Sequence, residues 1–225
     1  MTIKQQQHFS FTSNDDFEKN ACNYIITAAN ESIQRKDTFS LVLCGGRTPK
    51  NIFTKLKTEN TDWSKWNIFF GDERCLPEND DDRNSSMVKK NFLNSVPIPK
   101  NQIFFIKAEL GNIIAANQYN SLLENKDDFD LVLLGFGEDG HTASLFPGHY
   151  WDNSKHAVAI YDAPKQPKER VSMTASRLSR ADKILFLISG SNKQDAFKRW
   201  NDENDLPVSQ ITAKNELLIY SFGIS

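Results

Sequence analysis

Strand-like and helix-like segments alternate along almost the whole chain, and this alternation limits the possible folds more than any other feature. Apolar runs rich in β-branched and aromatic residues predict strands at 39–44, 66–70, 129–134, 156–161, 170–173, 183–188 and 216–220. Helical periodicity predicts helices at 15–35, 50–57, 85–93, 112–123 and 192–201. Because βαβ units build parallel sheets, we expect a Rossmann-like α/β fold: a doubly wound, mainly parallel sheet with helices on both faces.

No stretch of the sequence divides the chain into separate units. Its 225 residues are enough for one α/β domain with a large core. The proline-rich stretches 96–99 and 164–167 interrupt the pattern but are too short to link domains. We therefore expect a single α/β domain over residues 1–225.

Charge and cysteine content narrow the class of protein. The net charge is −2 and basic residues are scattered among acidic ones, so we expect neither nucleic acid nor a membrane as a partner. The three cysteines lack metal-ligand spacing, and the first residues lack the apolar core of a signal peptide. No apolar run approaches the length of a bilayer span. We expect a cytoplasmic protein with reduced thiols, as a monomer or small homo-oligomer.

The first candidate site follows the strand predicted at 39–44. There the chain reads Gly45, Gly46, Arg47, Thr48 and Pro49, which predicts a helix with Thr48 as its N-cap and Pro49 at its first position. Glycines let a backbone approach an anion, and the first N–H groups of a helix point at it. The pattern matches neither the dinucleotide fingerprint nor the nucleotide P-loop. It therefore predicts either a cradle for a small phosphate or a plain tight turn.

A second apolar strand delivers Asp72, Glu73 and Arg74 at its carboxyl end. One interpretation is a local ion-pair network. The other is that the planar guanidinium of Arg74 meets a phosphate or a developing oxyanion.

The third and most informative stretch is residues 130–148, where an apolar strand runs into a glycine-rich loop that carries Asp139 and His141. In open α/β sheets, ligands bind beyond the carboxyl ends of the strands. The flanking glycines leave His141 little core to be buried in, whereas the other histidines are interpreted as structural. His141 is therefore the candidate general base.

Two cations complete the set of candidates. Arg170 opens a predicted strand, and Lys193 lies at a turn between a strand and a helix. A lysine at a helix start is disfavoured by the helix dipole, which indicates either an anion bound there or an ordinary surface lysine.

Together these residues resemble the 6-phosphogluconolactonase family, within the glucosamine-6-phosphate isomerase/6-phosphogluconolactonase superfamily. The family motifs Gly-Gly-x-Thr-Pro and Asp-Glu-Arg are matched at 45–49 and 72–74. The long motif Gly-x-Gly-x-Asp-Gly-His-Thr-Ala-Ser-Leu-Phe-Pro-Gly is matched without a gap at 135–148. The motifs occur in the family's order over nearly the whole chain.

The resemblance implies hydrolysis of 6-phospho-D-glucono-1,5-lactone to 6-phospho-D-gluconate in the oxidative pentose phosphate pathway, without a metal or other cofactor. It also implies a fold like that of glucosamine-6-phosphate deaminase and a small sugar-phosphate lactone as the binding partner. We assign the catalytic roles to His141, Asp139 and Arg74. The substrate-binding residues implied are Gly45, Gly46, Arg47, Thr48, Asp72, Asn84, Gly140, Arg170 and Lys193.

The sequence departs from the family pattern at two places. Cys44 and Arg47 stand at positions where relatives more often have serine, so Arg47 either adds a phosphate contact or points to solvent. The usual Ser-Asn pair appears as Arg83-Asn84, and only Asn84 is carried over.

Two other functions are compatible with the resemblance. A glucosamine-6-phosphate deaminase would have an acidic residue shortly after the histidine, where this chain has Ser144, Leu145, Phe146 and Pro147. A non-catalytic sugar-phosphate sensor would be joined to a DNA-binding segment, and no basic helix-turn-helix pattern precedes Phe11. We therefore expect the lactonase.

Overall fold

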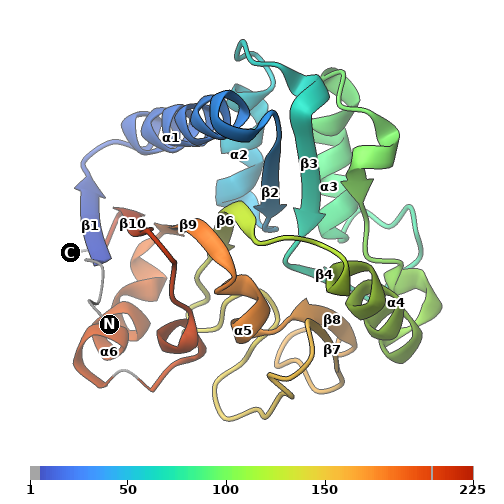
Figure 1. The fold of residues 1–225 in the computed structure, drawn as a ribbon. Helices are drawn as coiled ribbons and strands as arrows, with labels where there is room; N and C mark the ends of the chain where they lie inside the picture. The colour runs from blue at the N-terminus through green and yellow to red at the C-terminus, as the bar shows by residue number, and fades with distance from the viewer. Residues whose placement is uncertain (1–5, 204, 225) are drawn as a thin grey trace.

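The computed structural model describes residues 6–203 and 205–224, and a seven-stranded sheet dominates this part of the chain (Figure 1). All its neighbouring strands run parallel, in the order β1-β10-β9-β6-β2-β3-β5. The strands are β1 (Gln6–Phe11), β2 (Phe39–Leu43), β3 (Trp66–Phe70), β5 (Ile103–Phe104), β6 (Phe129–Gly135), β9 (Ala181–Ser189) and β10 (Glu216–Phe222). The predicted doubly wound parallel sheet is confirmed.

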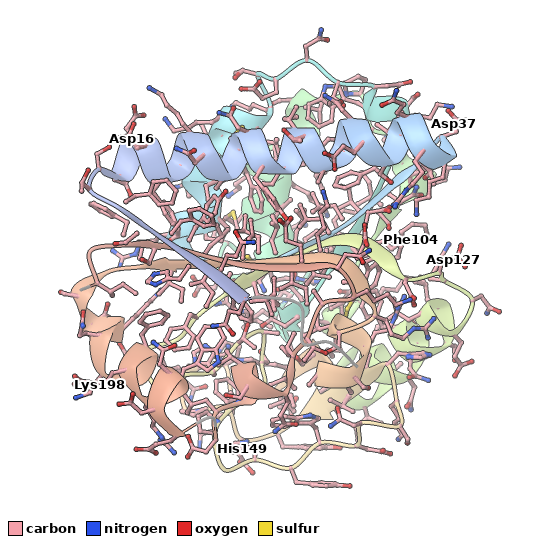
Figure 2. The ribbon with its side chains drawn as sticks, turned by 60° about the vertical axis from the view of Figure 1, so that its left-hand side comes forward. Asp16, Asp37, Phe104, Asp127, His149 and Lys198 are labelled. Carbon is pink, nitrogen blue, oxygen red and sulfur yellow. The ribbon has the colours of Figure 1, made fainter. Side chains whose placement is uncertain are left out.

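Helices cover both faces of this sheet. The helices are α1 (Asn14–Lys36), α2 (Arg47–Leu56), α3 (Asn84–Asn91), α4 (Asn112–Glu124), α5 (Ala175–Leu178) and α6 (Gln194–Glu203). Figure 2 shows the long α1 along one face and α6, which carries the labelled Lys198, on the other. Among the described residues, no helix is both long and apolar enough to cross a membrane.

Local chemistry explains why α1 forms where it does. The Ser13 side chain accepts a hydrogen bond from the Asp16 N–H at 3.0 Å, which caps the first turn. Acidic residues in the first turn and basic residues in the last turn complement the helix dipole. Its buried face presents Phe17, Ala21 and Ile25 to the sheet, and burying side chains such as Phe17 and Ile25 contributes about 1.5–3 kcal/mol each. Packing on the sheet therefore supplies most of the stability of this helix.

The central strands bury both of their faces, as parallel strands covered by helices must. In β6 the first six residues are buried, and in β2 four of the five are. The chain passes from β2 outward to β3 and β5 on one side and from β6 outward to β9 and β10 on the other, where the N-terminal strand β1 forms the edge. The strand order therefore reverses between β2 and β6, and a crevice at their carboxyl ends is the expected ligand site.

A second sheet adds a short antiparallel layer beside this crevice. It consists of β4 (Asp72–Arg74), β8 (Arg170–Met173) and β7 (Ala157–Ile160), in the order β4-β8-β7. The strands predicted at 156–161 and 170–173 thus exist but do not join the main sheet. Their antiparallel register places Arg74 directly opposite Arg170.

Several elements differ from the sequence prediction. Strand β1 was not predicted because its residues are mostly exposed at the sheet edge and carry no burial pattern. Strands β4 and β5 and helix α5 are too short to produce a periodic signal. The predicted N-cap at Thr48 is wrong: α2 begins at Arg47, with Gly46 as its cap at φ 110°.

Candidate active site

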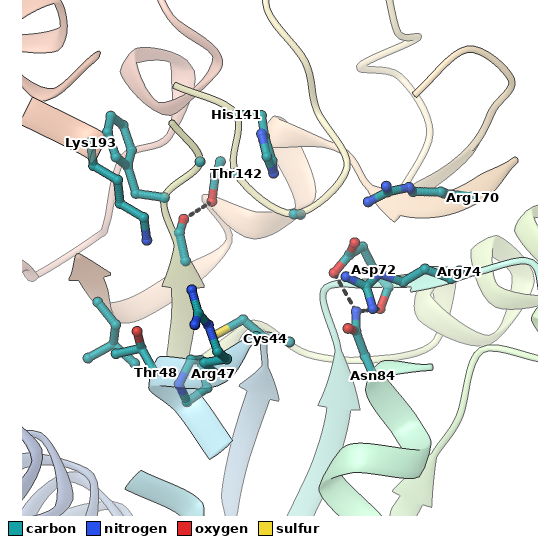
Figure 3. Close-up of a pocket in the computed structure, with 18 residues that line it drawn as sticks. Cys44, Arg47, Thr48, Asp72, Arg74, Asn84, His141, Thr142, Arg170 and Lys193 are labelled. Atoms are coloured by element: carbon teal, nitrogen blue, oxygen red, sulfur yellow. Dashed lines mark hydrogen bonds between the residues drawn. The ribbon is translucent and has the colours of Figure 1, made fainter. Parts of the chain in front are cut away.

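A cavity of about 200 Å³ lies at the carboxyl ends of β2 and β6, where the strand order reverses (Figure 3). Loops that follow β2, β6 and β9 line it together with residues of the small sheet. In Figure 3, Lys193, Arg47 and Thr48 lie on one side, Asp72, Arg74 and Asn84 on the other, and His141 points into the space between them. The three polar motifs of the sequence therefore meet in one place.

The glycine loop after β2 is shaped by a close approach. A Cβ atom added at Gly45 would lie 1.8 Å from Oδ1 of Asn84, so only glycine leaves room for that amide. The hydroxyl of Thr48 lies 3.1 Å from that of Ser189 at the end of β9. The loop is thus joined to α3 by packing and to β9 by a hydrogen bond.

Two cations at this side of the cavity have no acidic partner. Neither Arg47 nor Lys193 forms an ion pair with a carboxylate in the described part of the chain. Burial lowers the pKa of Lys193, and the charge of Arg47 lowers it further, although Cys44 and the carboxylate of Glu138 act in the opposite direction. A pair of neighbouring cations without a counter-ion is an arrangement that an anionic ligand would stabilise.

On the other side, Arg170 is 5% exposed and is held by backbone carbonyls. Its Nε donates to Pro167 at 3.1 Å and its Nη2 donates to Lys165 at 2.9 Å. Burial lowers the pKa of Arg170, and the carboxylate of Asp72 partly opposes this. The guanidinium is therefore fixed in orientation without being neutralised by a hydrogen-bonded carboxylate.

Arg74 lies across the strand pair from Arg170 and is also anchored through a carbonyl. Its Nη1 donates to the backbone oxygen of Asp82, and its Nε is buried without a hydrogen-bond partner. Two like charges directly opposite on antiparallel strands are unfavourable by themselves. Their neighbour Asp72 accepts hydrogen bonds from Asn84 at 2.9 Å and from Ser144 at 2.6 Å.

His141 and Asp139 form a hydrogen-bonded pair at the cavity. Nδ1 of His141 lies 2.5 Å from Oδ1 of Asp139, which also accepts the His141 backbone N–H at 3.2 Å. Although burial acts to raise it, the hydrogen bond and charge of His141 lower the pKa of Asp139 to about 2. A Cβ at Gly137 would lie 2.1 Å from Nδ1 of His141. Glycine at 137 is therefore required for the imidazole to occupy this position.

The segment after His141 is held by several hydrogen bonds. Ala143 has φ 49°, a left-handed conformation that is unfavourable for a residue with a Cβ. Its neighbours fix it: the Thr142 hydroxyl donates to the Gly135 carbonyl at 2.8 Å, and Ser144 N–H donates to the Ser172 hydroxyl at 3.1 Å. Such strain persists only where the surroundings determine it, and it is frequent at active sites.

The structure brings most of the predicted residues to the cavity. It is lined by Gly45, Gly46, Arg47, Thr48, Asp72, Arg74, Asn84, His141, Arg170 and Lys193. Asp139 is not among the lining residues and contacts the cavity through His141. Gly140 also lies outside the lining, because it packs against Leu206.

Sequence reasoning missed residues that support the site. The ring of Phe146 lies 4.7 Å from the ring of His141. The guanidinium of Arg170 lies 5.5 Å from the centre of the Phe146 ring. Ser144 holds Asp72, as described above. Both residues belong to the motif at 135–148, so that motif contained the signal, but their contacts depend on long-range packing.

Chemically, the arrangement suits acid–base catalysis on an anion. A histidine oriented by a carboxylate faces a cavity whose other polar walls carry four cations, Arg47, Arg74, Arg170 and Lys193. Within the described residues, no group of three or more His, Cys, Asp or Glu side chains is placed to hold a metal ion.

Comparison with known proteins gives a consistent result. Residues 12–220 match the model of a family described as glucosamine-6-phosphate isomerases/6-phosphogluconolactonase. The chain is 31% identical to a 6-phosphogluconolactonase of Mycobacterium tuberculosis over 202 residues, which cover 83% of this chain and 82% of that protein.

A plant relative is longer than this chain. The chain is 32% identical to the chloroplastic 6-phosphogluconolactonase 3 of Arabidopsis thaliana over 206 residues, which cover 82% of this chain but 63% of the relative. Among solved structures, a 6-phosphogluconolactonase from Thermotoga maritima matches with a TM-score of 0.89 at 25% identity, over 97% of this chain and 100% of that one.

Proposed function

Because the chain belongs to the glucosamine-6-phosphate isomerase/6-phosphogluconolactonase family, we propose that it hydrolyses 6-phospho-D-glucono-1,5-lactone to 6-phospho-D-gluconate. The observation that carries this proposal is the His141–Asp139 pair facing unpaired cations across one cavity. An activated ester with a remote phosphate needs both: a base for water, and a fixed anchor for the anion.

The phosphate is bound by the glycine loop and the cations. Gly45 and Gly46 present backbone N–H groups at the start of α2, and Arg47, Thr48 and Lys193 on the same side supply charge and hydroxyl donors. Arg170 reaches the bound substrate from the opposite side of the cavity. Anchoring the phosphate orients the lactone carbonyl at the other end of the molecule. Binding energy is thereby used for positioning, so a weaker anchor lowers the rate as well as the affinity.

His141 acts as the general base. It takes a proton from a water molecule as the water oxygen forms a bond to the lactone carbon, and Asp139 orients and stabilises the resulting imidazolium. The negative charge on the carbonyl oxygen is met by the guanidinium of Arg74. When the bond from the lactone carbon to the ring oxygen breaks, the imidazolium returns the proton to that oxygen. The products are a carboxylic acid and a hydroxyl group, which balances the addition of one water molecule.

The test is a coupled assay in which the lactone is made fresh and 6-phosphogluconate is measured above the spontaneous background. Purified protein is expected to accelerate hydrolysis, and His141→Ala is expected to lower kcat by about 10²–10⁴-fold with an unchanged fold. His156→Ala is the matched control, because His156 lies outside the cavity lining.

Parallel assays with glucosamine 6-phosphate separate this proposal from its relatives. Ammonia release without lactone hydrolysis would replace the lactonase with a deaminase. No reaction with either compound, together with tight binding of a sugar phosphate, would replace it with a sensor. Near-normal turnover by folded His141→Ala would remove the base assignment alone.

A further inference from the structure

Two charged side chains that do not line the cavity are almost fully buried next to it. Glu73 in β4 is 1% exposed, and Arg83, immediately before α3, is 2% exposed. Burying an ion costs several kcal/mol of solvation free energy, which hydrogen bonds and countercharges in the protein must offset. Their contacts therefore indicate what the pair does.

Glu73 binds the start of α3. Its Oε1 accepts the N–H of Asn84 at 2.7 Å, and its Oε2 accepts the N–H of Ser85 at 2.8 Å. Arg83 occupies the N-cap position, but a guanidinium has no acceptor and makes no cap there. The carboxylate of Glu73, on the neighbouring strand β4, caps the helix instead. The positive end of the helix dipole also stabilises its negative charge.

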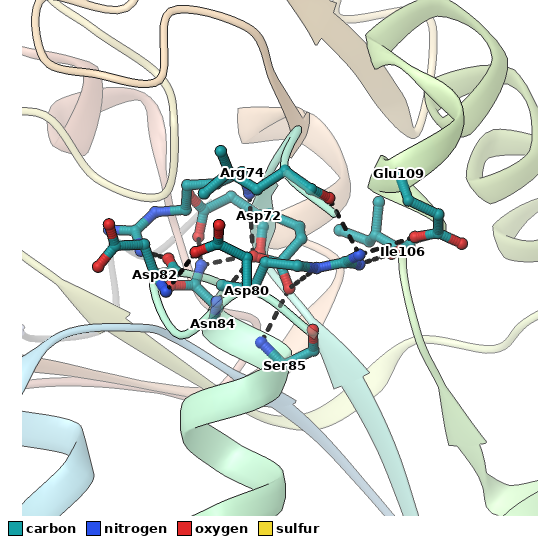
Figure 4. A network of polar contacts seen from close by, with 11 residues as sticks. Asp72, Arg74, Asp80, Asp82, Asn84, Ser85, Ile106 and Glu109 are labelled. Atoms are coloured by element: carbon teal, nitrogen blue, oxygen red, sulfur yellow. Dashed lines mark hydrogen bonds and ion pairs between the residues drawn. The ribbon is translucent and has the colours of Figure 1, made fainter. Parts of the chain in front are cut away.

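Arg83 supplies the countercharge for this buried carboxylate. Its Nε lies 3.6 Å from Oε2 of Glu73, its Nη1 2.8 Å from Oε2 of Glu109, and its Nη2 donates to the carbonyl of Ile106 at 3.0 Å. Figure 4 shows this network extending from Ile106 and Glu109 to Asn84 and Asp72. The guanidinium is thus held by Glu73 of β4 and by the segment that follows β5, which contains Ile106 and Glu109.

The far end of the network belongs to the cavity wall. Nδ2 of Asn84 donates to the backbone oxygen of Asp72 at 3.0 Å and to its Oδ1 at 2.9 Å. Oδ1 of Asn84 occupies the space next to Gly45 that a Cβ would need. The position of α3 therefore determines where Asn84 holds both the glycine loop and Asp72.

We propose that Arg83 is a positioning residue for the substrate. By neutralising Glu73 on the first turn of α3, it keeps the Asn84 amide between Gly45 and Asp72 and so preserves the anion-binding shape of the glycine loop. For catalysis the inference rests on the proposed function, whereas for anion binding and local order it stands on the contacts alone. Because Asn84 touches Gly45 directly but is linked to the His141 segment through Asp72 and Ser144, the main effect falls on affinity.

The first experiment measures 6-phosphogluconate binding and steady-state kinetics. Arg83→Met, which keeps the length of the side chain and removes its charge, is expected to raise Kd and KM by about tenfold while kcat changes by less than about threefold. Arg83→Lys, which retains a positive charge near Glu73, is expected to recover most of the affinity. Equal losses in kcat and in affinity, or no rescue by lysine, would contradict the proposal.

Arg177→Met is the matched control for the loss of a buried arginine. Arg177 is fully buried, donates to the carbonyl of Asp127 at 2.9 Å and packs on Phe129, but does not line the cavity. It is expected to leave Kd unchanged. A Kd raised equally by both substitutions would assign Arg83 a general role in stability only.

A second measurement does not depend on catalysis. Hydrogen exchange at the amides of Asn84 and Ser85 is expected to be slow in the unsubstituted protein and faster in Arg83→Met, with no such change in Arg177→Met. If the protein hydrolyses no lactone but this pattern holds and inorganic phosphate binding weakens in Arg83→Met, the proposed function fails and the positioning role stands. Unchanged exchange at both amides in folded Arg83→Met would overturn the positioning role.

Discussion

Both ends of the central sheet carry charged side chains, but those at the amino ends are paired, whereas several cations at the carboxyl ends are unpaired among the described residues. At the amino ends, the buried carboxylate of Asp130 is paired with Lys36 at 2.9 Å and accepts hydrogen bonds from the N–H and hydroxyl of Ser40, both at 2.8 Å. Lys183 and Glu31 pair nearby at 2.6 Å. At the carboxyl ends, Arg47 and Lys193 have no such partner among the described residues, and Arg170 is bound only by backbone oxygens.

This difference separates charges that stabilise the fold from charges that are available to a ligand. An ion pair whose members satisfy each other offers little charge to a solute, and removal of one member destabilises the fold by leaving the other unpaired. A half-buried cation without a counter-ion lowers stability until an anion arrives. Substitutions at the two ends should therefore change different quantities, some in opposite directions.

The largest effect is expected from Gly137→Ala. The new Cβ would overlap Nδ1 of His141 and Oδ1 of Asp139, so the pair must move. A displacement of about 1 Å in a catalytic group lowers turnover by about 10²-fold, measured as kcat in the coupled assay. Gly71→Ala is the control, because its Cβ would meet neighbours only at 3.6 Å or more. Normal turnover by Gly137→Ala would show that the geometry of this pair is not needed.

Next in size is Asp130→Ala at the opposite end. Removing the carboxylate leaves the Ser40 N–H without its partner and Lys36 without its counter-ion, which should lower the free energy of unfolding by about 2 kcal/mol. Urea denaturation measures this change, and Asp130→Asn, which keeps one acceptor, should lose less. The Kd for 6-phosphogluconate should stay the same. A change in Kd would break the distinction between the two ends.

Lys193→Met, unlike Asp130→Ala, should weaken ligand binding without lowering stability. Loss of one charge-assisted contact is expected to raise the Kd for 6-phosphogluconate by about tenfold, as calorimetry would measure. Without ligand, Tm should rise slightly, because a half-buried cation without a partner has been removed. A fall in the Tm of the ligand-free protein would mean that Lys193 has a structural partner.

The smallest expected effect is a change in ligand affinity with pH, caused by the titration of Lys193. Because burial lowers the pKa of Lys193, it loses its charge at a lower pH than a free lysine, and 6-phosphogluconate should bind progressively more weakly over the pH range just below the ordinary lysine pKa of about 10.4. In that window the unfolded chain holds more protons than the folded one, so this group makes the ligand-free protein more stable as pH increases. Lys193→Arg should flatten the binding profile. An equally steep profile in that variant would exclude Lys193 as its cause.

Asp139, in the same site, also makes the folded protein more stable as pH rises, but in the acidic range. Its pKa is lowered to about 2 in the folded protein, so its contribution to stability is complete above the unfolded value of 3.8 and is lost as pH falls towards about 2. It therefore remains a carboxylate throughout the neutral range, where it can orient His141.

Local sequence patterns predicted the long elements well. Helix α1 and strands β2, β3 and β6 lie within one or two residues of their predicted bounds, because burial along them is periodic or continuous. The same patterns missed β1, which is exposed, and the grouping of β7 and β8 with β4 in a separate sheet. Pairing partners are chosen by long-range packing, and a strand signal does not name its neighbour.

The candidate site divides in the same way. The sequence by itself determined which residues meet at the cavity, because the glycines, His141 and the cations follow apolar strands, and the carboxyl ends of parallel strands meet at one edge. Only the tertiary structure decided how these residues are oriented: Ser144 and Asn84 on Asp72, Phe146 against His141, and Glu73 with Arg83 at the start of α3. The physical reason is that hydrogen bonds and ring contacts act over a few ångströms, whereas partners such as Ser144 and Asp72 lie far apart along the chain and meet only when it folds.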